Sequence, residues 1–90
     1  MARAIRICDK DNVAVCLGPV KKGDIVNYGI NEKVVAIMDI PVGHKIAIKS
    51  IEKGNYIIKY GEIIGIATED IQRGAHVHVH NVGSLRFKER

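Results

Sequence analysis

Histidine is concentrated near one end of this 90-residue sequence, where three of its four copies fall within five positions as His76, His78 and His80. If this stretch is an extended strand, successive side chains point to opposite faces, so the three imidazoles form one row. Val77 and Val79 then point to the other face, toward a core. Each imidazole can titrate near neutral pH, donate or accept a hydrogen bond, or bind a metal ion. The spacing therefore predicts a strand with one chemical face and one core face.

The same row could hold a transition metal, because imidazole is a ligand for Zn, Cu, Fe and Ni. Side chains two residues apart on a strand stand roughly 7 Å from each other, too far to share one ion unless the strand twists. We therefore expect an active-site or ligand-binding role for the row rather than a metal held by this chain alone. The open alternative is a polar row in which each ring is satisfied by backbone or carboxylate groups.

His44 and Lys45 form a second candidate site, directly after the turn glycine Gly43 and at the start of an expected strand. Side chains at such a position stand at the rim of a sheet. His44 could donate a proton or contact an anion there, or it could be a half-buried ring with satisfied hydrogen bonds. Lys45 would offer a point charge to a carboxylate.

Lys59 and Tyr60 could present an ammonium and a phenol to one anionic ligand, although Lys59 could equally be a solvated edge residue. Asn81 could fix the tautomer of a histidine or close a turn. Asp11 and Asn12 are expected to cap a turn through side-chain to backbone hydrogen bonds.

The elements that must position these residues are short strands. Ile and Val together number 25, against 2 Leu, 1 Phe and no Trp, and β-branched residues are typical of sheets. No segment keeps a helical apolar stripe over ten residues, so an all-β domain is expected. The expected strands are Ala4–Cys8, Val13–Leu17, Val34–Met38, His44–Ile48, Tyr56–Tyr60, Ile63–Ala67 and His76–His80.

A short unit, in which two residues separate an aliphatic residue from a glycine, occurs four times and predicts four tight turns that each feed a strand. The copies are Val20-Lys21-Lys22-Gly23, Ile40-Pro41-Val42-Gly43, Ile51-Glu52-Lys53-Gly54 and Ile71-Gln72-Arg73-Gly74. Their spacing predicts two related halves that begin at Val20 and Ile51. Tyr28-Gly29 and Tyr60-Gly61 support this, one residue out of register.

Composition excludes several classes of function. The net charge of +4 comes from the two ends, residues 1–10 and 86–90, while the body between them is neutral, so no nucleic-acid surface is expected. Two cysteines form no disulfide framework, and no apolar run or leader pattern indicates a membrane span or secretion. We expect a cytoplasmic protein. A domain of this size is often marginal alone and gains from a partner or a second copy of itself.

Five motifs occur in order: Asp11-Asn12-Val13-Ala14-Val15, Gly43-His44-Lys45-Ile46-Ala47, Ile58-Lys59-Tyr60-Gly61, Ile64-Gly65 and His76-Val77-His78-Val79-His80-Asn81. Together they resemble the N-terminal domain of the altronate and galactarate dehydratases, which is a SAF domain with a β-clip fold. The resemblance covers residues 9–82, and we expect residues 1–90 to form one such compact domain. The small subunit of (2R)-sulfolactate sulfo-lyase resembles the same domain.

The resemblance implies a lyase that removes water, or sulfite, from a polyhydroxy or sulfonated acid with the help of a divalent metal, iron being the usual expectation. Because the sequence ends at Arg90, we expect a small subunit, inactive without a large catalytic dehydratase chain that holds most of the metal ligands. The residues that match family motifs are assigned accordingly: His78, His80 and His44 as catalytic, and Lys45, Lys59, Tyr60, His76 and Asn81 as contacts to a small sugar-acid anion. Two alternatives stay open, a sulfolactate sulfo-lyase small subunit and a non-enzymatic carbohydrate- or partner-binding module.

Overall fold

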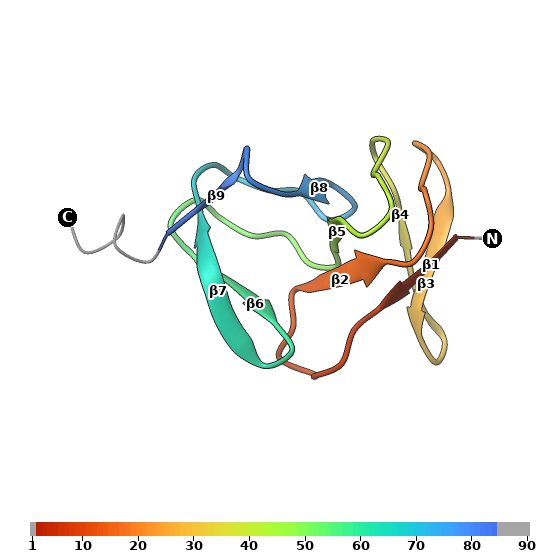
Figure 1. Cartoon of the computed structure of the whole chain (residues 1–90), viewed down its shortest axis with the longest axis horizontal. Helices are drawn as coiled ribbons and strands as arrows, with labels where there is room; N and C mark the ends of the chain where they lie inside the picture. Colours follow the sequence, from red (N-terminus) through yellow and green to blue (C-terminus); the bar gives the residue numbers. More distant parts are fainter. Residues whose placement is uncertain (1, 85–90) are drawn as a thin grey trace.

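Nine short strands and no helix make up the computed structural model, which describes residues 2–84 (Figure 1). The expected all-β fold is confirmed. No helix in these residues is long and apolar enough to cross a membrane. The strands are β1 (Ala2–Ile5), β2 (Val13–Cys16), β3 (Ile25–Gly29), β4 (Glu32–Val35), β5 (Lys45–Ala47), β6 (Tyr56–Lys59), β7 (Glu62–Ala67), β8 (His76–Val77) and β9 (Val82–Gly83).

The strands form two curled sheets. Six strands lie in the order β4-β3-β1-β2-β5-β8 and three in the order β6-β7-β9. Only β1 and β3 pair in parallel, and the other described strand pairs are antiparallel. In Figure 1, β2 crosses the centre, with β1, β3 and β4 to its right and the hairpin of β6 and β7 to its left.

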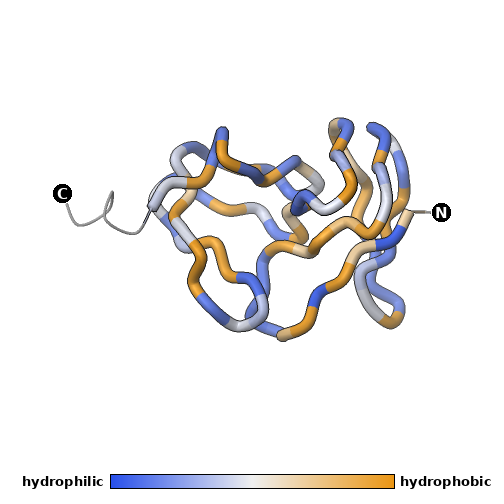
Figure 2. The backbone as a smooth tube through the Cα atoms, in the orientation of Figure 1, coloured by the Kyte–Doolittle hydropathy of each residue, from blue (hydrophilic) through white to orange (hydrophobic). Residues whose placement is uncertain are grey.

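The core consists of two aliphatic clusters with β2 and β5 between them. Ala14 and Ile46 face the first cluster, while Val13 and Ala47 face the second, and all four are fully buried. Strands buried on both faces read as continuous apolar runs, as these do. The backbone tube is correspondingly orange along β2 and along much of β7 (Figure 2). This burial fixes β5, which begins beside one of the candidate histidines.

The expected internal repeat is confirmed by the hydrogen bonds. Val20 pairs with Ile40 in an isolated bridge, and Ile51 pairs with Ile71 in the same way, at a constant spacing of 31 residues (20 to 51, 40 to 71). The same spacing relates two further pairs of hydrogen bonds, all of 2.8 Å. The bond from Gly23 N to Ala36 O recurs from Gly54 N to Ala67 O. The bond from Lys22 N to Asp39 Oδ1 recurs from Lys53 N to Asp70 Oδ1. All four repeat glycines have positive φ, as the turns require.

Asp11 has the turn-capping role expected of it, whereas Asn12, expected to share that role, bonds to a distant strand instead. The buried carboxylate of Asp11 accepts hydrogen bonds from the backbone N–H of Cys8 at 3.2 Å and of Gly61 at 2.7 Å. The side chain of Asn12 accepts from Ile58 N and donates to Tyr56 O, each at 2.8 Å. The loop after β1 is thereby attached to the β6–β7 hairpin.

Several expected strand bounds are wrong. The strand expected at Ala4–Cys8 is Ala2–Ile5, because the chain turns after it toward the Asp11 carboxylate. The strand expected at Val34–Met38 ends at Val35. The expectation did not include β3, although the turn at Gly23 precedes it.

Candidate functional site

The histidine stretch is not one strand, and this is the main correction to the sequence-based expectation. Strand β8 ends at Val77, and a turn follows. Asn81 closes the turn: its Oδ1 accepts from His78 N at 3.0 Å, and its Nδ2 donates to His76 O at 2.8 Å. Val79, which was expected in the core, is 80% exposed, whereas Val77 is fully buried. His76, His78 and His80 therefore do not form a straight row.

The turn gathers the rings, and strand pairing adds a fourth. β5 pairs with β8 so that Ile46 lies opposite His76, which places His44 diagonally across from His76. His44 Nδ1 and His76 Nε2 share a hydrogen bond of 2.8 Å, in which one nitrogen donates and the other accepts. The ring of His44 also stacks on that of His78, with centroids 3.8 Å apart. The two candidate sites of the sequence are thus one cluster of four histidines.

His80 lies at the outer side of this cluster. Its ring centroid is 5.0 Å from that of His76, at a tilted angle. It is exposed, while the other three histidines are half-buried. His80 therefore remains open to a ligand in solution.

Burial and mutual repulsion set the charge of the cluster. Burial lowers the pKa of His76, and the neighbouring His80, His44, His78 and Lys45 lower it further. The pKa of His78 is also lowered, by partial desolvation first and then by His44, Lys45 and His80. Since the ordinary pKa is 6.5, both rings are mainly neutral at pH 7. Neutral rings can accept a proton or offer a lone pair.

Three rings of the cluster also fit a metal ion. One ligand nitrogen from each of His44, His76 and His78 lies within 4.8 Å of the other two. Within residues 2–84, no other trio of histidine, cysteine or acidic side chains is this close. Three imidazoles are a ligand set that divalent transition metals accept in proteins.

Lys45 is a further charged candidate residue, next to His44 at the start of β5. Strand alternation puts it on the face opposite to His44 and Ile46, and burial followed by the charge of Lys59 lowers its pKa. Lys45 interacts electrostatically with both Lys59 and His78. The positive charge of Lys45 is therefore felt on both sides of the sheet.

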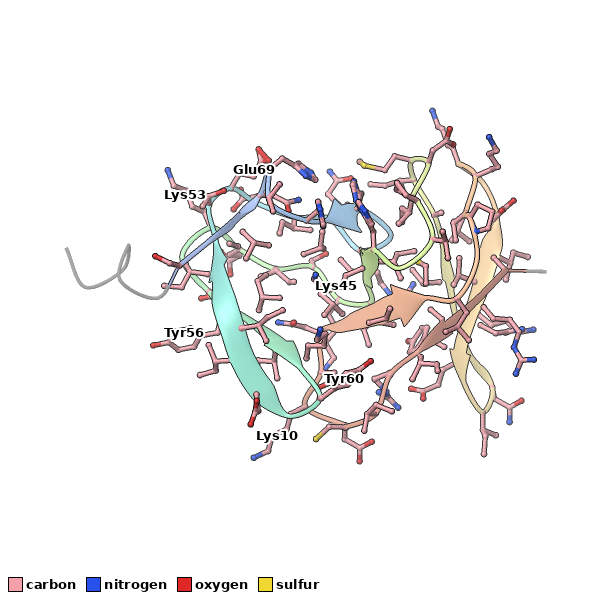
Figure 3. The ribbon with its side chains drawn as sticks, viewed as in Figure 1. Lys10, Lys45, Lys53, Tyr56, Tyr60 and Glu69 are labelled. Atoms are coloured by element: carbon pink, nitrogen blue, oxygen red, sulfur yellow. The ribbon has the colours of Figure 1, made fainter. Side chains whose placement is uncertain are left out.

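Tyr60 lies apart from the histidines, at the turn between β6 and β7, and β2 separates it from β8 in Figure 3. Lys59 Nζ is 5.1 Å from the centroid of its ring. Asn81 is 4% exposed, and both polar atoms of its side chain are engaged in the turn. Its observed contacts are those of a residue that positions His76 and His78.

An open cavity of about 460 Å³ adjoins the cluster. It is lined by His76 and His80, by the apolar side chains Ile37 and Met38, and by residues 69–72, 75 and 81. Sequence reasoning did not include Glu69, which Figure 3 labels at the outer edge of this region, or Asp70. The repeat could have indicated Asp70, because it corresponds to Asp39 at the spacing of 31 residues.

Comparison with known proteins gives one consistent result. The family model described as the altronate/galactarate dehydratase SAF domain matches residues 2–85. Altronate dehydratase of Bacillus subtilis is 44% identical over 82 residues, which are 90% of this chain and 16% of that protein. Altronate dehydratase of Escherichia coli is 46% identical over 77 residues, 86% of this chain and 15% of that protein.

A relative of different length is also similar. The (2R)-sulfolactate sulfo-lyase subunit alpha of Paracoccus pantotrophus is 44% identical over 55 residues, which are 61% of this chain and 82% of that subunit. The chain thus spans about one sixth of the altronate dehydratases it matches but most of this shorter subunit.

Proposed function

The chain belongs to the altronate/galactarate dehydratase SAF domain family, and from this we propose that it is the small subunit of a lyase acting on a sugar acid such as altronate or galactarate. The observation that carries the proposal is the meeting of His44 with His76 and His78 across the β5–β8 pair. Imidazoles with lowered pKa beside an open cavity are typical of a site that moves protons.

Removal of water from such an acid needs two proton transfers. A base takes the proton from the carbon next to the carboxylate, the C–O bond of the neighbouring carbon breaks, and an acid protonates the departing hydroxyl so that water leaves. We assign these transfers to His78, His80 and His44. Lys45 and Lys59 would attract the carboxylate by charge, His76 would contact it, and Asn81 would position the rings. Tyr60 was expected as a further contact, but it lies on the other side of β2 from the histidines (Figure 3).

A divalent metal such as iron, held mainly by the large chain, would supply a Lewis acid at the departing oxygen. The trio of half-buried imidazoles has the donor type for such an ion.

The site is shallow, which supports a shared active site. The cavity is open, and apolar side chains are exposed around the histidines: Ile37, Met38, Val42 and Val79. Exposed apolar groups beside a polar site are typical of surfaces that pack on another chain. We propose that a large catalytic dehydratase chain covers this surface and completes the site.

A second candidate function is favoured by the similarity to a sulfo-lyase subunit of comparable length. In this case the departing group is sulfite rather than hydroxide, while the base at the carbon next to the carboxylate is the same. The cationic field of Lys45 and Lys59 would suit the additional negative charge of a sulfonated acid.

Reconstitution with a large dehydratase chain tests both candidates. The complex would be assayed for loss of water from altronate and galactarate and for release of sulfite from sulfolactate. The double variant His78→Ala, His80→Ala should lower turnover by at least about 100-fold, the usual size of a general acid–base contribution. Lys21→Ala, an exposed lysine in a turn of the first half, is the control. Unchanged turnover in the double variant, with the complex intact, would instead favour a non-enzymatic binding module.

A further inference from the structure

The three half-buried histidines are held by a rigid backbone frame. His44 lies where its N–H donates to Pro41 O at 3.1 Å and its carbonyl accepts from Cys16 N at 2.9 Å. His76 belongs to β8, and the N–H of His78 is fixed by Asn81. All three ligand residues are therefore positioned before any ion binds, as a preorganised metal site requires.

Their spacing is close to that of a coordination shell. Nitrogens bound to one tetrahedral ion at the usual bond length lie about 3.3 Å from each other. His44 Nδ1 and His76 Nε2 are 2.8 Å apart, and the trio as a whole falls within 4.8 Å. The three rings are stacked with interplanar angles of 10–22°, so binding one ion would require them to rotate on this backbone until their nitrogens converge.

The charges around the trio indicate what else would bind. Imidazole binds a metal as an uncharged ligand, so three of them leave the charge of a divalent ion uncompensated, and Lys45 adds a positive charge nearby. The acidic groups at the adjoining cavity, Glu69 and Asp70, are not members of the trio, and Asp70 accepts from Lys53 N. Such a centre is electrophilic and favours an anionic oxygen as its next ligand.

We propose that His44, His76 and His78 bind one divalent transition metal ion within this chain itself, with an open coordination position for an anionic oxygen of a ligand. His80 is not a ligand and faces the cavity beside the ion. This goes beyond the lyase assignment, in which the metal was expected mainly on the large partner, and it does not depend on that assignment. It changes the roles given there, because with the ion bound His44 and His78 are ligands and His80 is the histidine that stays free to transfer a proton.

The experiment uses the full chain alone, freed of metal with a chelator and titrated with Co²⁺ and, separately, Zn²⁺. We expect one equivalent per chain in calorimetry and visible absorption bands for Co²⁺ bound by nitrogen. His44→Ala, His76→Ala and His78→Ala should each abolish stoichiometric binding, whereas His80→Ala should retain it. Absent or non-saturating binding to the unaltered chain would overturn the proposal, as would loss of binding in His80→Ala or full binding in His44→Ala.

A measurement on the unaltered chain guards against variants that do not fold. With Zn²⁺ bound, nitrogen NMR of the imidazoles should show ligation through Nδ1 of His44 and Nε2 of His76, the two atoms that already face each other. Unchanged nitrogen shifts in either ring at saturation would refute the site. Because neither measurement involves a substrate or a large chain, a failure here is separate from a failure of the lyase proposal.

Discussion

Gly74→Ala tests the close packing that places the histidine turn against the rest of the fold. Gly74 has a φ of +93°, and an added Cβ would lie 2.2 Å from Val35 O and 3.3 Å from a methyl carbon of Ile37. The left-handed conformation costs a non-glycine residue about 1–2 kcal/mol. Crowding against a backbone carbonyl adds about 1–3 kcal/mol. We therefore expect a total loss of about 2–5 kcal/mol in the free energy of unfolding.

The repeat supplies matched controls for this change. Gly23 and Gly54 have φ of +92° and +90°, and an added Cβ at either position meets nothing within 4 Å. Alanine there should cost only the conformational part, about 1–2 kcal/mol. Urea denaturation followed by circular dichroism gives the three free energies, and each kcal/mol corresponds to roughly 4–8 °C in the midpoint of thermal unfolding. Equal losses at positions 23, 54 and 74 would refute the reasoning, because the contact with Val35 O would then have no energetic weight.

Three further measurements follow from buried polar groups. Asp11→Ala should lower the free energy of unfolding by about 2–4 kcal/mol, because it leaves buried N–H groups without an acceptor. Urea denaturation measures this loss. The control is Asp9→Ala at an exposed position, which should cost less than about 0.5 kcal/mol. Stability should fall as pH drops through 6.5, because the lowered pKa of His76 means that the unfolded chain binds more protons there. Burial acts to raise the pKa of Asp11, but the backbone N–H donors outweigh it and lower that pKa. A second loss of stability should therefore follow below pH 3.8. Midpoints of thermal unfolding that do not fall between pH 8 and pH 3 would contradict both pKa directions. Burial raises the pKa of the Cys16 thiol to about 11. An alkylating reagent at pH 8 should therefore label the half-exposed Cys8 alone in the folded chain and both cysteines in urea. Mass spectrometry that finds Cys16 labelled in the folded chain would contradict its burial.

The features that local sequence signals could predict are those set by neighbouring residues. A glycine three residues after each repeated aliphatic residue predicted the turns and the two halves, and the abundance of β-branched residues predicted an all-β fold. Asp11 was assigned a capping role because its side chain can reach nearby backbone groups, as it does at Cys8 N. In each of these cases the physical cause lies within a few residues of the signal. The bonds of Asn12 to Tyr56 and Ile58 span 44 and 46 residues and were not predicted.

The arrangement of the histidines could not be predicted in this way. Alternation of His and Val predicted a strand through His80, but two hydrogen bonds from Asn81 stabilise a turn after Val77 instead. The contact of His44 with His76 depends on the register of β5 against β8, across 32 residues of sequence. A shift of one residue in that register would send His76 to the opposite face.

The internal repeat has a consequence for how such a site can arise and change. The bonds that recur at the 31-residue spacing involve mainly backbone atoms, so the frame tolerates different side chains at corresponding positions. At that spacing His44 corresponds to Ala75, and His76 corresponds to Lys45. The cluster therefore forms where β5 of the first copy pairs with β8, its counterpart in the second copy, at positions where the copies differ. Neither copy alone brings His44 to His76 and His78, so the pairing of the two copies is what creates a place for chemistry.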